Sequence, residues 1–196
     1  MGEGTDRGLR RVVAGVAIAN LAYFCVEFAV ASAIGSVSLF ADSADFLEDA
    51  SLNLLVLLAL GWSPRGRARL GLFLACLLLA PGIATAWTAW TRFTSPGAPD
   101  PGALGLTGLG ALAVNFGCAL LLARRRDHGG SLTKAAFLSA RNDVIASLAI
   151  IAAGAATALT HARWWDLGVG LGIAAMNLDA ARTVWRAARR EGRGGW

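Results

Sequence analysis

Long apolar runs alternate with short polar or glycine-rich links along the whole chain. The runs predict six helices, near residues 11–34, 38–61, 68–92, 103–124, 132–158 and 164–186. Each run reaches the roughly 20 mostly apolar residues that a helix needs to cross a membrane. The pattern therefore predicts an all-α membrane protein, a six-transmembrane-helix bundle in which residues 1–196 form a single transmembrane domain.

The composition agrees with a protein embedded in a membrane. Of the 196 residues, 56% are hydrophobic and only 16% are charged, and the mean hydropathy is +0.55. Such values are typical of a multi-span integral membrane protein rather than of a soluble domain. The net charge of +5 does not indicate a nucleic-acid partner, because the basic residues lie in short links between the predicted helices.

The basic residues also predict the orientation of the bundle. Fifteen of the 18 Lys and Arg residues lie near the two termini, in the second and fourth links or, for Lys134, just beyond the fourth link. Only Arg92 and Arg163 lie on the opposite side. Cytoplasmic segments of membrane proteins are enriched in Lys and Arg. Both termini are thus expected in the cytoplasm, with the protein in the plasma or inner membrane. Trp90, Trp164 and Trp165 are expected at the outer boundary, where amphipathic rings are favoured.

The second predicted helix carries charges where a span should be apolar. The stretch "SLFADSADFLEDASLN", residues 38–53, holds four carboxylates, and an ionisable group in mid-membrane is costly unless it faces protein, water or an ion. Asp45 and Asp49 form an i, i+4 pair on one face, and their like charges repel unless a divalent cation or protons neutralise them. They indicate a site that exchanges a metal ion for protons. Asp42 shares this face but is expected at the solvated end of the helix.

A second polar face lies in the fifth predicted helix, within "FLSARNDVIAS", residues 137–147. Asp143 sits near mid-span, and Ser139 and Asn142 share its face. Together with the carboxylate pair of the second helix, this face gives two half-sites on separate helices. A carboxylate and polar side chains in mid-span make this face a second candidate functional site.

Other ionisable residues in the predicted spans have several roles open to them. Arg141 points away from the polar face of its helix and must pair with an acid or reach the membrane surface. Its candidate partners are Glu48, Glu27 and Asp179. Glu27 fits an outer-shell carboxylate, a proton relay or the partner of Arg141, and Asp42 is a further candidate for a proton relay or ion pair. In the last predicted helix, Asp166 suits the positive end of the helix dipole, and Asn177 is expected to serve packing.

The stretches "FCVEFAVASAIGSVSLFADSADFLEDA" and "AAFLSARNDVIASLAIIAAG" resemble the cation diffusion facilitator family of metal efflux transporters, over about 180 residues. The pattern of the family in the second helix falls here on Asp45 and Asp49. Its repeat in the fifth helix falls on Ser139 and Asp143. The resemblance implies a tetrahedral metal site between these helices, and export of divalent metals, commonly zinc, in exchange for protons. It also implies a homodimer that alternates between inward-open and outward-open states.

The chain departs from the family pattern in ways that bear on the metal. Ser139 replaces the expected His or Asp, which leaves three carboxylates and a weak hydroxyl, with Asn142 as a substitute ligand. Such an all-oxygen set favours harder ions such as Mn²⁺, with Fe²⁺ or Co²⁺ also compatible, and does not exclude zinc. The fourth link has no His-rich stretch, and the chain stops about ten residues after the sixth predicted helix. The sequence thus resembles a short branch without the cytoplasmic C-terminal domain, so any dimer must be held by the helices.

These features together predict a divalent metal cation efflux transporter that works by metal/proton antiport, with the metal as substrate and no resident cofactor. One alternative is a non-transporting relic or membrane partner protein that keeps the bundle, which Ser139 and the short tail favour. Another is an intramembrane enzyme that uses Asp45 and Asp143 as acid and base. The chain has no further catalytic signature, such as a strained Gly-x-Gly-Asp turn, so we predict that it is not an enzyme.

Overall fold

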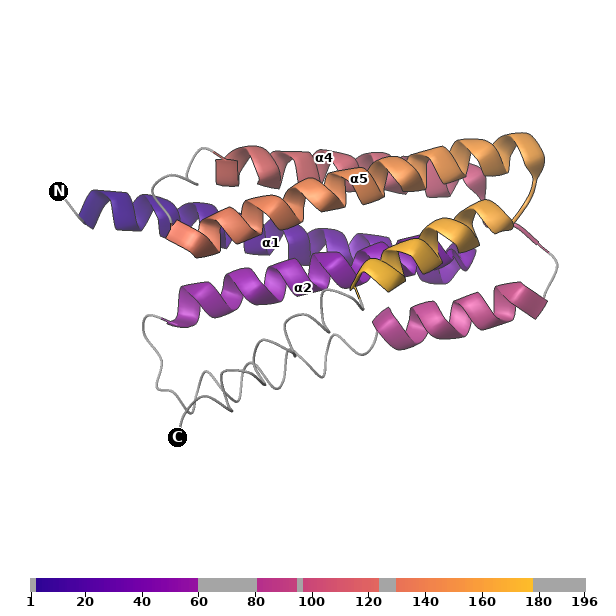
Figure 1. Ribbon diagram of the computed structural model, residues 1–196, viewed down its shortest axis with the longest axis horizontal. Helices are drawn as coiled ribbons and strands as arrows, with labels where there is room; N and C mark the ends of the chain where they lie inside the picture. The colour runs from indigo at the N-terminus through magenta and orange to yellow at the C-terminus, as the bar shows by residue number, and fades with distance from the viewer. Residues whose placement is uncertain (1–2, 60–80, 95–96, 124–129, 178–196) are drawn as a thin grey trace.

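The computed structural model describes residues 3–59, 81–94, 97–123 and 130–177. These residues contain no strand, and they form six helical segments (Figure 1): α1 (Glu3–Ile34), α2 (Val37–Ala59), 81–94, α4 (Pro101–Ala123), α5 (Gly130–Thr160) and 164–177. The all-α fold class predicted from the sequence is confirmed. The cytoplasmic location of the termini stays a prediction.

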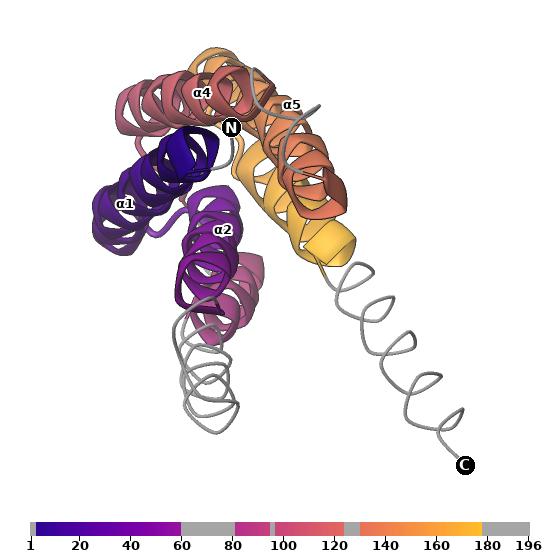
Figure 2. The ribbon, with the colours of Figure 1, turned by 90° about the vertical axis from the view of Figure 1, so that its left-hand side faces the viewer.

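The helical segments run side by side as an elongated bundle. α1 packs along α2 and α4 packs along α5, and the two pairs meet where α1 contacts α4 and α2 contacts α5. Figure 2, viewed along the bundle, shows segment 164–177 beside α5 and segment 81–94 beside α2. Five of the segments contribute buried side chains to one apolar core, which includes Ala31, Leu39, Leu104, Ile150 and Ile173.

Three helices of the described part are long and apolar enough to cross a membrane, at Arg10–Ile34, Pro101–Ala123 and Asn142–Thr160. Large apolar side chains cover their outer faces, and Ile18 and Leu106 are 68% and 73% exposed. Such faces suit contact with lipid. α2 is as long as α4, at 23 residues, but it differs in charge because it holds all four carboxylates of the acidic stretch.

Two helices extend beyond the predicted spans. α1 begins at Glu3 rather than near residue 11, and α5 covers Gly130–Thr160 rather than 132–158. A helix can continue past the apolar core of a membrane because polar and basic side chains are solvated there, and Arg10 and Arg11 are both exposed. The first half of predicted helix 68–92, most of the Arg-rich links and the end of predicted helix 164–186 lie outside the described residues.

Only Gly35 and Ser36 connect α1 to α2. Gly35 has a φ of 62°, a left-handed conformation that favours glycine, and the Ser36 N–H donates to the Ala31 carbonyl at 3.2 Å. This arrangement is a Schellman turn, which closes α1. The Ser36 Oγ then accepts a hydrogen bond from the Leu39 N–H at 3.2 Å and caps α2. The short turn holds the two helices antiparallel and in close contact.

Two glycines allow helices to approach one another backbone to backbone. A Cβ atom on Gly154 of α5 would lie 3.1 Å from the Gly105 backbone of α4. A Cβ atom on Gly170 would lie only 2.6 Å from the Ser38 nitrogen and the Val37 carbonyl carbon of α2. Small residues permit such contacts between membrane helices, and Gly170 brings segment 164–177 against the first turn of α2.

Exposed aromatic side chains gather at the end of the bundle that holds the α1–α2 turn. Trp90, Trp164 and the neighbouring Trp165 are all exposed, and the rings of Phe93 and Trp164 meet edge to face with centroids 5.6 Å apart. The Arg92 Nε donates to the Gly35 carbonyl at 2.8 Å, which ties segment 81–94 to the turn. Tryptophans from two distant parts of the sequence therefore share one end, as a membrane boundary requires.

Candidate metal-binding site

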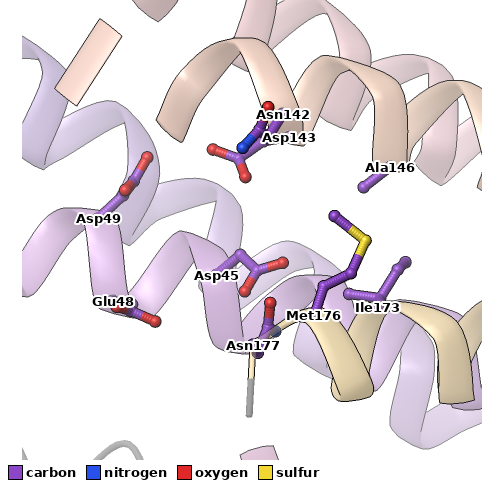
Figure 3. Close-up of a pocket in the computed structure, with 9 residues that line it drawn as sticks. All are labelled: Asp45, Glu48, Asp49, Asn142, Asp143, Ala146, Ile173, Met176 and Asn177. Carbon is purple, nitrogen blue, oxygen red and sulfur yellow. The ribbon is translucent and has the colours of Figure 1, made fainter. Parts of the chain in front are cut away.

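A cavity of about 130 Å³ opens between α2, α5 and segment 164–177. Its wall holds the three aspartates of the predicted cation site, together with Glu48 and other polar and apolar side chains (Figure 3). The lining residues are Asp45, Glu48, Asp49, Asn142, Asp143, Ala146, Ile173, Met176 and Asn177. A water molecule takes roughly 30 Å³ of the liquid, so the cavity has room for a cation and a few waters.

The packing of α2 against α1 directs two carboxylates into this cavity. Phe46 and Leu47 are almost completely buried, and the Phe46 ring contacts that of Tyr23 in α1 with centroids 4.9 Å apart. Phe46 thus occupies the α1 side of α2, and Asp45 and Asp49 face the cavity instead (Figure 3). Glu48 also lines it, but its side chain is exposed and points away from α5.

The α5 wall presents Asp143, whose carboxyl group faces that of Asp49 across the cavity (Figure 3). The two carboxyl groups are close enough that two negative charges there would repel each other. The turn of α5 that carries Asp143 is fixed from behind, since the Ser147 Oγ donates to the Asp143 carbonyl at 2.8 Å and accepts from the Asn115 Nδ2 of α4 at 3.1 Å. Two acids from distant parts of the chain thus meet inside the bundle.

Segment 164–177 forms a third wall of the cavity, which the sequence did not predict. Asn177, expected to serve packing only, lines the cavity, and so do Met176 and Ile173. Figure 3 shows the Met176 side chain extending toward Asp143 and Ala146. No periodicity in the sequence could assign these residues, because the neighbours of a helix are set by the tertiary arrangement rather than by its own repeat.

The cavity is accessible from outside the bundle. Asn142 and Glu48 are exposed, and the three aspartates are partly buried. Among the described residues, no three Asp, Glu, His or Cys side chains are close enough together to hold a metal ion as they stand. Asp45, Asp49 and Asp143 therefore share one cavity without forming a closed ligand set.

Two residues of the predicted site cannot be placed from their side chains. Ser139 and Arg141 lie in α5, but their side chains are outside the described part of the chain, and so is Asp179. The choice between Ser139 and Asn142 as a ligand stays a prediction, although Asn142 does line the cavity. The partner of Arg141 stays open among the predicted candidates.

Asp42 lies in a different environment from the solvated helix end predicted from the sequence. It is completely buried, at 0% exposure, as is Glu27, so the expectation of a solvated helix end is wrong. Asp42 is also absent from the lining of the cavity, and its carboxyl group approaches that of Glu27 in α1. The polar face of α2 therefore has two environments: Asp42 is buried against α1, whereas Asp45 and Asp49 line the cavity. A face about 80° wide on one helix can contact two neighbouring helices.

Asp166 has a wider role than the predicted one at the start of its own helix. Its carboxylate accepts four hydrogen bonds from the first turn of α2, where the donors are the Ser36 Oγ, the Val37 N–H and both the N–H and the Oγ of Ser38. At the same end, Arg92 donates to the carbonyls of Ile34 and Gly35 at the end of α1. Positive charge suits a helix C-terminus and negative charge an N-terminus.

Apolar spans around an accessible pocket lined by acids define a membrane transporter for cations. Residues 13–191 match the family described as the cation efflux transmembrane domain. The chain belongs to this family, and the resemblance to cation diffusion facilitators is confirmed. It is an integral, multi-pass membrane protein and a cation transporter, and members of the family are transporters rather than enzymes. Comparison with curated proteins finds no match.

Proposed function

We propose that the protein exports a divalent metal cation in exchange for protons through the cavity between α2 and α5. The observation that carries the proposal is the meeting of Asp45, Asp49 and Asp143 in one accessible cavity of a cation efflux bundle. Carboxylates inside membrane proteins mark ion and proton pathways. The cytoplasmic location of both termini and a homodimer belong to the same proposal.

The chemistry of the lining supports a divalent ion as the substrate. The Asp45, Asp49 and Asp143 carboxylates and the Asn142 amide supply oxygen donors, which suit Mn²⁺ and are compatible with Fe²⁺, Co²⁺ and Zn²⁺. The thioether of Met176 is the softest group in the wall. An ion held between α2 and α5 offsets the charge of acids that would otherwise repel one another.

The contact between Asp49 and Asp143 supports an exchange with protons. In this proposal, one of the two neighbouring carboxyl groups carries a proton whenever the ion is absent, because two negative charges there would repel each other. A divalent cation that enters the cavity displaces this proton and draws Asp45 and the other carboxylates around it, with water or Asn142 completing its coordination. Since no three acidic side chains of the described residues are close enough to hold an ion as they stand, the proposal requires these carboxylates to move when the ion binds.

One observation favours the alternative of a membrane partner protein that no longer transports. The described carboxylates do not form a set that could hold an ion as they stand. In that case the acids of the cavity would stay protonated, and metal would neither bind nor cross the membrane.

Metal uptake into proteoliposomes tests the proposal. Wild type would be reconstituted with a pH gradient and offered Zn²⁺, Mn²⁺, Fe²⁺ and Co²⁺ separately, beside Asp49→Ala. Asp100→Asn is a matched control, because Asp100 is exposed, lies in a link and caps α4 through its Oδ1, which asparagine can also do. We expect gradient-dependent uptake of at least one ion by wild type and by the control, and none by Asp49→Ala. Folded wild type that moves no ion would support the partner-protein alternative.

A further inference from the structure

Glu27 and Asp42 bring two carboxyl groups together in the interface between α1 and α2. Both residues are 0% exposed. Glu27 lies seven residues before the end of α1 and Asp42 five residues after the start of α2, which at 1.5 Å per residue places both roughly 8–10 Å from the turn. The tight α1–α2 turn thus holds the two acids at nearly the same depth in the bundle.

Neither acid has a hydrogen-bond donor in the part of the chain that the structure describes. All four carboxyl oxygens of Glu27 and Asp42 are buried without a partner of this kind. Tyr23, which lies near both acids, donates its hydroxyl proton to the Thr107 carbonyl of α4 instead. Two ionised carboxylates in this position would repel each other without any compensating donor, an arrangement that burial makes very costly.

A single proton resolves this conflict. A carboxylic acid is a donor as well as an acceptor, so a proton on either residue supplies the donor that the four buried oxygens lack. The pair then carries one negative charge instead of two. Metal ions suit the pair poorly, because zinc takes four ligands and harder divalent ions take six or more, and neither acid lines the accessible cavity.

The pair lies close enough to the cavity to sense an ion there. Asp42 and Asp45 are three residues apart on α2, and side chains at this spacing are neighbours on a helix. Among the side chains that the structure describes, the titratable groups near the pair are Tyr23 of α1, Asp45 of α2 and Asp143 of α5. A cation held by Asp45 and Asp143 adds positive charge near Glu27 and Asp42, which favours the ionised form of the pair. Salt screens this effect little, because the charges are buried.

We propose that Glu27 and Asp42 form a proton-binding site of their own, which shares one proton and releases it when a cation occupies the neighbouring cavity. This proton is additional to the one between Asp49 and Asp143. The release step rests on the proposed function, whereas the shared proton does not depend on it.

Infrared spectroscopy of the metal-free protein tests the shared proton. A protonated carboxyl group has its own C=O stretching band, and a buried one exchanges its proton for deuterium slowly. We expect a slowly exchanging band in wild type that is lost or shifted in Glu27→Gln and again in Asp42→Asn. Asp100→Asn, which removes an exposed carboxylate, should leave the band unchanged. An unaltered band in both folded variants would overturn the site, and the use of two variants covers the failure of one to fold.

The release step is tested by counting protons when metal binds. Wild type, Glu27→Gln and Asp100→Asn would be titrated with Mn²⁺, or with Zn²⁺, by calorimetry at one pH in buffers of different protonation enthalpy. We expect Glu27→Gln to release about one proton fewer per ion than wild type and than the control. Equal counts would overturn the release step. Wild type that binds neither ion would overturn the release step together with the proposed function, while the infrared result still decides whether the proton is shared.

Discussion

The carboxylate of Asp166 caps α2 from another helix by accepting two hydrogen bonds from Ser38, at 3.1 Å from its backbone nitrogen and 2.6 Å from its Oγ. The same carboxylate also accepts from the Val37 N–H at 2.8 Å. Asp166 lies near the start of segment 164–177, so this contact ties the last described helix to the acid-bearing helix. The cavity begins at Asp45, eight residues or about 12 Å along α2 from Val37. The contact thus fixes one end of α2, beyond the candidate metal site.

Removal of this cap should destabilise the bundle. Asp166→Ala removes the carboxylate that accepts from the buried Ser36 and Ser38 hydroxyls, and leaves these hydroxyls only their 3.3 Å contact with each other. Hydrogen bonds to a charged group contribute roughly 1.5–3 kcal/mol each and are not additive, so we expect a loss of about 3 kcal/mol. Thermal unfolding in detergent would show a clear drop in the melting temperature, with a smaller drop for Asp166→Asn. A melting temperature unchanged in Asp166→Ala would contradict the importance of the cap.

Gly170 should tolerate no side chain, whereas its neighbour Gly172 should. A Cβ atom at Gly170 would meet the backbone of Val37 and Ser38, but one at Gly172 has nothing within 4 Å. Overpacking of this kind costs about 1–3 kcal/mol. We therefore expect Gly170→Ala to lower the melting temperature and the transport rate, while Gly172→Ala matches wild type. Equal behaviour of the two variants would show that this helix contact is looser than the structure indicates.

The direction of the side chains in the cavity predicts which acids matter for metal. Asp143→Asn removes a carboxylate that faces Asp49, whereas Glu48→Gln removes one that is exposed and points away from α5 (Figure 3). Loss of a partner of a metal ligand already weakens binding about 10–100-fold, so we expect at least that loss for Asp143→Asn and little change for Glu48→Gln. Calorimetric titration with Mn²⁺ and Zn²⁺ measures both. Similar losses in the two variants would indicate a nonspecific effect of net charge.

The distribution of basic residues predicts the orientation of the bundle, and cysteine labelling measures it. Thr94 is exposed at the end that holds the tryptophans, and Arg10 is exposed toward the N-terminus. In a background without the three native cysteines, a Thr94→Cys variant should react with a membrane-impermeant maleimide on intact cells. An Arg10→Cys variant should react only after the cells are permeabilised, because the basic side is expected in the cytoplasm. The reverse pattern would show the opposite orientation.

The sequence is sufficient to predict the helices and part of the candidate site. Apolar runs of spanning length locate the segments of the bundle, since the membrane allows few other structures. The i, i+4 spacing places Asp45 and Asp49 on one face, and Asp143 stands out because a carboxylate in mid-span requires a partner. All three line one cavity.

The remaining contacts depend on how the helices pack, which no local pattern encodes. Asp42 shares a face with Asp45 by helical geometry, yet it is buried against α1 rather than in the cavity. From the sequence, Asp166 is predicted only at the start of its own helix. Its hydrogen bond with Ser38, 128 residues away, has no signal in the local sequence. Asn177 likewise enters the cavity only through the packing of its segment. Polar residues in predicted spans can thus be recognised as candidates from the sequence, whereas their contact partners require the structure.

The central claim is that metal and protons cross in opposite directions through the cavity between α2 and α5. The most direct test follows both at once, in proteoliposomes that enclose a metal indicator and a pH indicator. For wild type, we expect metal added outside to enter while the lumen becomes more alkaline as protons leave, and we expect neither change with Asp143→Asn. Metal entry without a pH change, or full exchange in the folded variant, would contradict the claim.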